Sequence, residues 1–225
     1  MLGRTVSLAR PSGTVLIEAP GDTAFRALNR GSTVPVGVTV DAGRGKVTLV
    51  TAIDASGTTQ EATIWGGSFQ VSQSPTGHGM TDLYMAGGSF ASCPPGQQGA
   101  GEGARTARSA RTARSAPAVR PGRSGPRVIR QLWATDHHGR FRTHGRESVA
   151  TVRGTTWHTV ESCAGTVTQV SKGKVAVRDL DRHRTVLVGA GHHYMALCND
   201  QSSSAPTPSS NTPTAGASRR THARP

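Results

Sequence analysis

Histidine and cysteine are the residues of this sequence that could hold a metal ion. Among the nine histidines, the candidates for metal ligands are two doublets and one further residue of the second half, His137, His138, His144, His192 and His193. Doublets on turns cannot chelate one ion together unless folding brings them side by side, so we expect surface histidines. The three cysteines form no Cys-x-x-Cys pair, which disfavours a zinc site. We therefore expect no metal centre.

The sequence also lacks the patterns that would indicate catalysis. It contains no Gly-x-Ser-x-Gly elbow, no phosphate-binding glycine-rich loop and no pair of carboxylates at a useful spacing. We expect neither a catalytic residue nor a cofactor-binding residue. The sequence therefore favours a binding or structural protein over an enzyme.

A run of arginines could bind a polyanion. Arg105, Arg108, Arg111 and Arg114 recur at every third residue, a spacing that places no apolar stripe on a helix, and like charges extend the chain. We therefore predict a disordered spacer between two folded halves. The alternative is contact with a nucleic acid, a wall polymer or anionic lipid headgroups. Such contact would be electrostatic and salt-dependent, because no aromatic residue is interleaved to stack on bases.

Composition and charge divide the chain of 225 residues into ordered and disordered parts. Apolar residues make up 34%, aromatic residues 4%, and there are 28 Gly and 13 Pro, so part of the chain cannot bury enough apolar surface to fold. The net charge is +13, of which the segment 94–130 alone carries +7, with eight arginines against one glutamate. The folded parts are thus not strongly basic. No apolar run approaches 18 residues, so no membrane-spanning helix is expected.

The remaining sequence has the two-residue periodicity of short β-strands. From residue 148 onward, apolar and β-branched residues alternate in segments that turn residues separate. No segment offers three turns of amphipathic helix. We predict strands at 14–19, 34–40, 47–52, 68–71, 81–85, 149–152, 156–160, 166–170, 174–178, 184–188 and 193–196. The predicted organisation is a first β-rich half at 1–93, a Gly/Pro/Arg-rich linker at 94–130, a second β half at 131–198 and a Ser/Thr/Pro-rich tail at 199–225.

Part of this sequence resembles a FecR domain. The segment Ser-Val-Ala-Thr-Val-Arg-Gly-Thr-Thr-Trp at 148–157, followed by Gly-Thr-Val-Thr-Gln-Val at 165–170 and Lys-Gly-Lys-Val-Ala-Val at 172–177, is similar to the distal part of that family. The segments 31–41 and 45–49 are similar to its proximal part. The resemblance implies an all-β envelope domain that senses, relays or scaffolds and is not an enzyme. We expect short antiparallel strands in a twisted solenoid- or sandwich-like FecR-type arrangement, with a disordered linker and tail.

The most distinctive part of this resemblance is the run Arg153, Gly154, Thr155, Thr156 and Trp157. We interpret it as structural. Gly154 can adopt a positive φ where the chain reverses, and Trp157 can bury a large surface in a core that is otherwise poor in aromatic residues. A tryptophan that stacks on a ligand is the alternative.

Cellular location follows from the cysteines and the resemblance. Three cysteines among many short strands suit an oxidising compartment, so we expect an extracellular or cell-envelope protein that contacts another envelope protein or an anionic wall polymer. Arg4 and Arg10 interrupt the first ten residues, which lack the apolar segment of a signal peptide, so a signal would lie upstream. The alternative is a cytoplasmic protein that binds nucleic acid through its arginine-rich linker.

The three cysteines allow three single pairings, and we predict a disulfide between Cys93 and Cys163, with Cys198 outside the bridge. Cys93 ends the first half and Cys163 lies in a turn of the second half, so this bridge would tie the halves across the linker. Peptide mapping under non-reducing conditions should yield one linked Cys93–Cys163 peptide. A linked peptide that contains Cys198 would refute this pairing, and three thiols that alkylate without reduction would support the cytoplasmic alternative.

Overall fold

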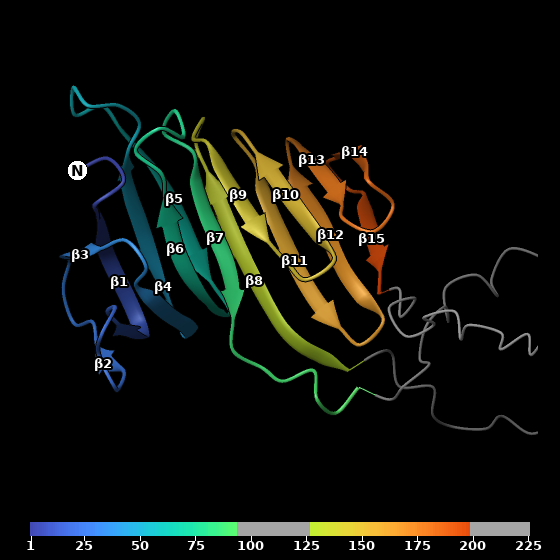
Figure 1. Cartoon of the computed structure of the whole chain (residues 1–225), viewed down its shortest axis with the longest axis horizontal. Helices are drawn as coiled ribbons and strands as arrows, with labels where there is room; N and C mark the ends of the chain where they lie inside the picture. Colours follow the sequence, from blue (N-terminus) through green and yellow to red (C-terminus); the bar gives the residue numbers. More distant parts are fainter. Residues whose placement is uncertain (94–126, 199–225) are drawn as a thin grey trace, which may run out of the picture.

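The computed structural model describes residues 1–93 and 127–198, which form β-strands joined by turns (Figure 1). The all-β class is confirmed. Within these residues, no helix has the length and apolar character needed to cross a membrane. The strands are β1 (Thr5–Glu18), β2 (Arg26–Ala27), β3 (Ser32–Pro35), β4 (Thr39–Ala52), β5 (Thr59–Trp65), β6 (Ser68–Gln73), β7 (Thr81–Ala86), β8 (Val128–Asp136), β9 (Phe141–His144), β10 (Ser148–Val152), β11 (Thr156–Ser162), β12 (Gly165–Lys172), β13 (Lys174–Asp179), β14 (Arg184–Gly189) and β15 (His193–Leu197).

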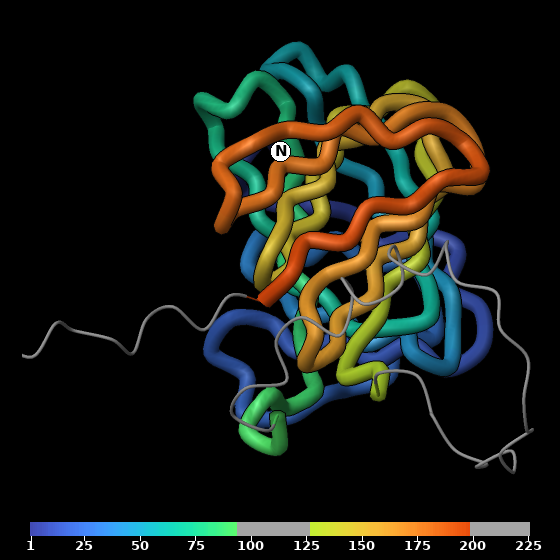
Figure 2. The backbone as a smooth tube through the Cα atoms, turned by 90° about the vertical axis from the view of Figure 1, so that its right-hand side faces the viewer, coloured from blue at the N-terminus to red at the C-terminus, as the bar shows by residue number. Residues whose placement is uncertain are grey.

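The strands of the described residues belong to one hydrogen-bonded sheet, which the long strand β4 divides into two arms. Residues 39–41 of β4 pair with β6, whereas residues 46–52 pair with β5. One arm, which we call the β6 arm, continues through β7, β9, β10, β13 and β14. The other, the β5 arm, continues through β8, β11, β12 and β15. The two arms face each other, and the sheet nearly closes into a barrel (Figure 2).

The two halves of the sequence interleave in this sheet. β8, the first strand of the second half, pairs with β5 in antiparallel orientation, and β9 pairs with β7 in parallel orientation. The turns after β8, β10, β12 and β14 each carry the chain from one arm to the other, and we call them crossovers. β8 begins inside the predicted linker 94–130, of which residues 94–126 lie outside the described residues, as does the predicted tail 199–225.

Small aliphatic side chains fill most of the core between the arms, and a few aromatic rings lie among them. Trp157, Phe69 and Phe141 are the largest fully buried side chains. The indole Nε1 of Trp157, on the β5 arm, donates a hydrogen bond of 3.0 Å to Thr143 Oγ1 on the β6 arm. A buried indole N–H needs such an acceptor. The largest side chain of the core is therefore also a polar tie between the arms.

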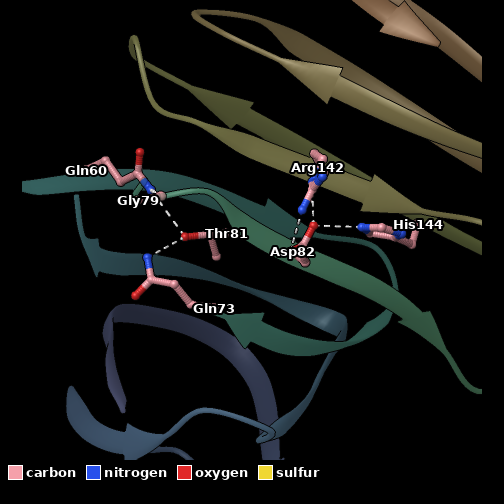
Figure 3. A network of polar contacts seen from close by, with 7 residues as sticks. All are labelled: Gln60, Gln73, Gly79, Thr81, Asp82, Arg142 and His144. Carbon is pink, nitrogen blue, oxygen red and sulfur yellow. Dashed lines mark hydrogen bonds and ion pairs between the residues drawn. The ribbon is translucent and has the colours of Figure 1, made fainter. Parts of the chain in front are cut away.

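A buried amide and hydroxyl network ties the arms at a second place (Figure 3). Thr81 Oγ1 on β7 lies 3.2 Å from Gln60 Nε2 on β5 and 3.1 Å from Gln73 Nε2 on β6. Gln60 Nε2 also donates to the carbonyl oxygen of Gly79 at 2.6 Å, and Gln60 Oε1 accepts from the backbone N–H of Arg140 at 2.7 Å. Satisfied buried networks of this kind favour one arrangement of the layers over others.

The disulfide predicted between Cys93 and Cys163 is present, with Cα atoms 5.3 Å apart. It joins the segment that follows β7 to the turn between β11 and β12. The bridge closes a loop with a sequence separation of 70 residues, which corresponds to about 4 kcal/mol of stabilisation in the loop-entropy model. Cys198 is not part of this bridge, and its thiol interacts with the Glu147 carboxylate.

The strands predicted from residue 148 onward are confirmed, whereas the first half departs from the prediction. A single strand at 34–40 is wrong: the chain turns between β3 and β4, where Gly37 has a φ of +89°. β1 begins at Thr5, nine residues before the predicted start at 14. β5, β8 and β9 were not predicted. These strands take their place from long-range pairing, which local periodicity does not reveal.

Candidate functional site

The buried carboxylate of Asp136 holds two crossovers together at the end of β8. Asp136 is 3% exposed, and its Oδ2 accepts hydrogen bonds of 2.8 Å from the backbone N–H groups of Gly139 and Gly154. Its Oδ1 accepts from the N–H of Thr155 at 2.8 Å and from the Thr155 hydroxyl at 3.3 Å. Several donors offset the cost of burying a carboxylate. Asp136 therefore fixes the turn before β9 against the turn before β11.

The Arg-Gly-Thr-Thr-Trp run occupies the second of these crossovers. Gly154 has a φ of +69°, and a Cβ at this position would lie 3.2 Å from Nδ1 of His138. Glycine adopts this backbone conformation without the steric cost that other residues incur. On either side of the turn, Trp157 is fully buried and Arg153 is exposed. The run thus anchors the turn in the core while it presents Arg153 to solvent.

A third crossover lies directly beside the second. Thr135, Thr156 and Lys172 are cross-strand neighbours on β8, β11 and β12. Gly173, which follows Lys172, has a φ of +80°, and a Cβ there would lie 2.8 Å from the carbonyl oxygen of Gly154. The three turns therefore pack closely at one end of the barrel. We call their residues, 137–140, 153–155 and 172–174, the crossover rim.

The crossover rim carries exposed cations. Arg140, Arg153, Lys172 and Lys174 are all exposed. Arg140 is partly engaged, because its Nη1 donates to the carbonyl oxygen of His78 at 2.7 Å. None of the ion pairs among the described residues involves Arg153, Lys172 or Lys174. Three cationic side chains on adjacent turns are thus available to a ligand.

The buried carboxylates of the second half are bonded inside the fold. Glu161 is fully buried and pairs with Arg130. Asp179 is fully buried and accepts a hydrogen bond of 2.7 Å from the Tyr194 hydroxyl. Asp136 accepts hydrogen bonds from the backbone N–H groups of the crossover at Gly154 and Thr155. These carboxylates stabilise the barrel, and they do not pair with the cations of the rim.

A second group of charged side chains lies on the outer surface where β7 and β9 pair (Figure 3). Asp82 Oδ1 and Oδ2 accept from Arg142 Nε at 2.6 Å and Nη2 at 2.9 Å, and Asp82 Oδ1 lies 2.7 Å from His144 Nε2. The ring of Tyr84 stacks on that of His144, with centroids 4.3 Å apart. Because β7 belongs to the first half and β9 to the second, this cluster fastens the two halves together.

The charged partners of Asp82 govern its protonation. Burial alone would raise the pKa of this carboxyl, but hydrogen bonds with His144 and Arg142 and their charges outweigh burial, so the pKa of Asp82 is lowered. The hydrogen bond with Asp82 in turn raises the pKa of Arg142. A carboxylate with a lowered pKa is a weak general base. The arrangement is better suited to holding strands together than to moving a proton.

Aromatic side chains form a row on the outer face of the β5 arm. Trp65 on β5, Trp133 on β8 and His158 on β11 are cross-strand neighbours. The ring centroids of Trp65 and Trp133 are 5.9 Å apart, those of Trp133 and His158 are 3.9 Å apart, and both pairs are stacked. Lys46 Nζ lies 4.9 Å from the centroid of Trp65. Burial lowers the pKa of His158, which keeps its ring neutral at neutral pH. The three rings stack on one another. Because Trp65 belongs to the first half of the sequence and Trp133 and His158 to the second, the row links the two halves, as the Asp82 cluster does.

The histidines considered as metal ligands are spread over the barrel. His144 lies beside Asp82, His137 and His138 are exposed on the crossover rim, and His192 and His193 are exposed near the turn between β14 and β15. In the part of the chain that the structure describes, no three His, Cys, Asp or Glu side chains are close enough to hold a metal ion.

The arginines predicted to contact a polyanion, Arg105, Arg108, Arg111 and Arg114, lie outside the described residues, so polyanion binding by them stays a prediction.

The sequence analysis missed two features of the site, the aromatic row and the Asp82 cluster. Both consist of outward-facing residues of strands, but their partners depend on which strands pair and in which register. The alternation along one strand carries no such information.

Comparison of the chain with models of known protein families, with curated proteins and with solved structures gives no match. The similarity to FecR domains therefore rests on the residues quoted from the sequence. Any function has to be inferred from the fold, the disulfide and the surfaces described above.

Replacement of Asp136 by Asn should lower the free energy of unfolding by about 2–3 kcal/mol, because an amide loses the charge and one of the two acceptor atoms that hold the crossovers. Asp54→Asn is the matched control, since Asp54 also accepts from turn N–H groups, those of Ser56 and Thr58, but is only half-buried and lies in an exposed turn. The Asp54→Asn variant should lose less unfolding free energy than the Asp136→Asn variant. Urea denaturation at neutral pH measures both, and equal losses would contradict the role assigned to Asp136.

The lowered pKa of Asp82 makes the stability of the protein depend on pH. The contribution of Asp82 is complete above the pKa of an unfolded aspartate, about 3.9, and is lost as the pH falls through the lower pKa of the folded state. Asp82→Asn should therefore flatten the fall in unfolding free energy below about pH 4. Arg142→Gln, which removes the partner instead, should flatten it as well. Urea titrations from neutral to acid pH test this, and an unchanged slope in both variants would refute it.

Proposed function

We propose that the protein is a non-enzymatic, FecR-like β-domain protein of the bacterial cell envelope, which contacts another envelope protein or a wall polymer. The Cys93–Cys163 disulfide is the observation that carries this proposal. Stable disulfides belong to oxidising compartments, and this one closes the long segment between the two halves. A protein with such a bridge is suited to work outside the cytoplasm.

The FecR-like segments support the proposal through their positions in the fold. The segment 148–157 comprises β10, a crossover and the start of β11, and the segments 165–170 and 172–177 lie on β12 and β13. They form contiguous strands and turns rather than scattered matches. A domain of this kind is expected to sense, relay or scaffold.

The chemistry of the polar groups supports a non-enzymatic role. Asp82 is held by Arg142 and His144, and Asp136 is held by backbone N–H groups of the crossovers. A catalytic carboxylate needs a free oxygen within reach of a substrate proton. The oxygens of Asp82 and Asp136 accept hydrogen bonds from other groups of the chain, so these carboxylates stabilise the fold instead.

The redox state of the cysteines in the native compartment tests the location. Thiols are blocked with an alkylating agent before the cells are broken, and the peptides are then analysed by mass spectrometry with and without reduction. Cys93 and Cys163 should become accessible to alkylation only after reduction. Alkylation of both before reduction would place the protein in a reducing compartment and would refute the envelope assignment.

Binding of nucleic acid tests the cytoplasmic alternative. Duplex and single-stranded DNA are titrated into the full chain and into a variant with Arg105, Arg108, Arg111 and Arg114 replaced by Ser. We expect no sub-micromolar binding by the wild type at physiological salt. Sub-micromolar binding that disappears in the variant would favour a nucleic-acid-binding protein over the envelope proposal.

A further inference from the structure

The crossover rim carries three exposed cations, Arg153, Lys172 and Lys174, on two turns that pack against each other. Lys172 and Lys174 flank Gly173, whose missing Cβ lets that turn approach the carbonyl oxygen of Gly154, the residue after Arg153. None of the three cations takes part in an ion pair of the described residues. The positive field of the rim is therefore directed to solvent, where it can attract an anionic ligand.

The backbone that carries these cations is held in place before any ligand arrives. Asp136 accepts hydrogen bonds from the N–H groups of Gly154 and Thr155, and Gly173 packs against the same turn. A surface that needs no backbone ordering loses less entropy when it binds. Arg153, which is exposed, thus lies on a turn that hydrogen bonds and packing hold in place.

The chemistry of the rim selects one class of ligand. Lysine and arginine bind phosphate oxygens, and several of them on one surface favour a ligand with repeated negative charges. The turns 137–140, 153–155 and 172–174 contain no Trp, Tyr or Phe. A base-bearing polymer would find no such ring to stack on. We propose that Arg153, Lys172 and Lys174 form a binding site for a linear phosphodiester polymer of the cell wall, an inference that rests on the proposed envelope function.

The test compares two variants of the full chain that lose the same number of charges. The rim variant carries Arg153→Ser, Lys172→Ser and Lys174→Ser. The control variant carries Arg4→Ser, Arg30→Ser and Arg44→Ser, three exposed arginines of the first half that take part in no ion pair of the described residues. A third variant, Arg153→Lys with Lys172→Arg and Lys174→Arg, keeps the charge. Circular dichroism and the intact disulfide report on folding.

The probe is end-labelled poly(glycerol phosphate), titrated by fluorescence anisotropy over a range of salt concentrations. The rim variant should bind at least about 10-fold more weakly than the wild type, and its log–log salt slope should fall by about 2, since each lost phosphate contact removes about 0.7–0.9. The control and charge-keeping variants should bind within about 2-fold of the wild type. Oligothymidylate of equal charge serves as the base-bearing competitor and should bind no more tightly.

Three outcomes would overturn the inference. The first is that the rim variant binds the polymer as tightly as the control variant. The second is that oligothymidylate binds more tightly than the polymer and loses this binding in the rim variant. The third is that the wild type does not bind the polymer. None of these alters the thiol-blocking result, which tests the envelope location separately. Failure of the rim can thus be distinguished from failure of the proposed function.

Discussion

The buried charge of Asp136 is the constraint around which the second half of the barrel is organised. A carboxylate in the interior needs donors, and here they are backbone N–H groups of two crossovers together with the Thr155 hydroxyl. Once these groups are bound, the turn at Gly154 is fixed in its left-handed conformation, with Trp157 on the core side and Arg153 on the solvent side. Asp136 thereby holds the turn that links an exposed cation to the largest residue of the core.

The rest of the fold compensates for a core of small side chains. Valine and alanine supply much of the buried surface, so the arms are also joined by polar contacts, such as Trp157 to Thr143 and Gln60 to Thr81. Where the two sequence halves meet, the Asp82 cluster spans the contact between β7 and β9 and the aromatic row spans that between β5 and β8. The disulfide adds a covalent link at the opposite end of β8 from Asp136.

Local chemistry explains which parts of the structure the sequence could predict. The strands from Ser148 onward are short and separated by tight turns, most of which contain glycine, so periodicity located each of them. The disulfide was predictable because Cys93 ends the first half and Cys163 lies in a turn of the second half, so that a bridge between them ties the halves together. By contrast, the partners of Trp65 and of Asp82 follow from the order of strands around the barrel, which no local pattern encodes. Lys172 and Lys174 join Arg153 only because two crossovers pack side by side.

Hydrogen exchange at single amides tests the central role of Asp136 most directly. If its carboxylate holds the crossovers, the N–H groups of Gly154 and Thr155 should exchange only with the global unfolding of the barrel, like amides in the middle of a strand. The exposed turn amides of Ser56 and Thr58, which bond to the Asp54 carboxylate, provide the comparison and should exchange much faster. Exchange of Gly154 and Thr155 at the rate of these turn amides would contradict the account.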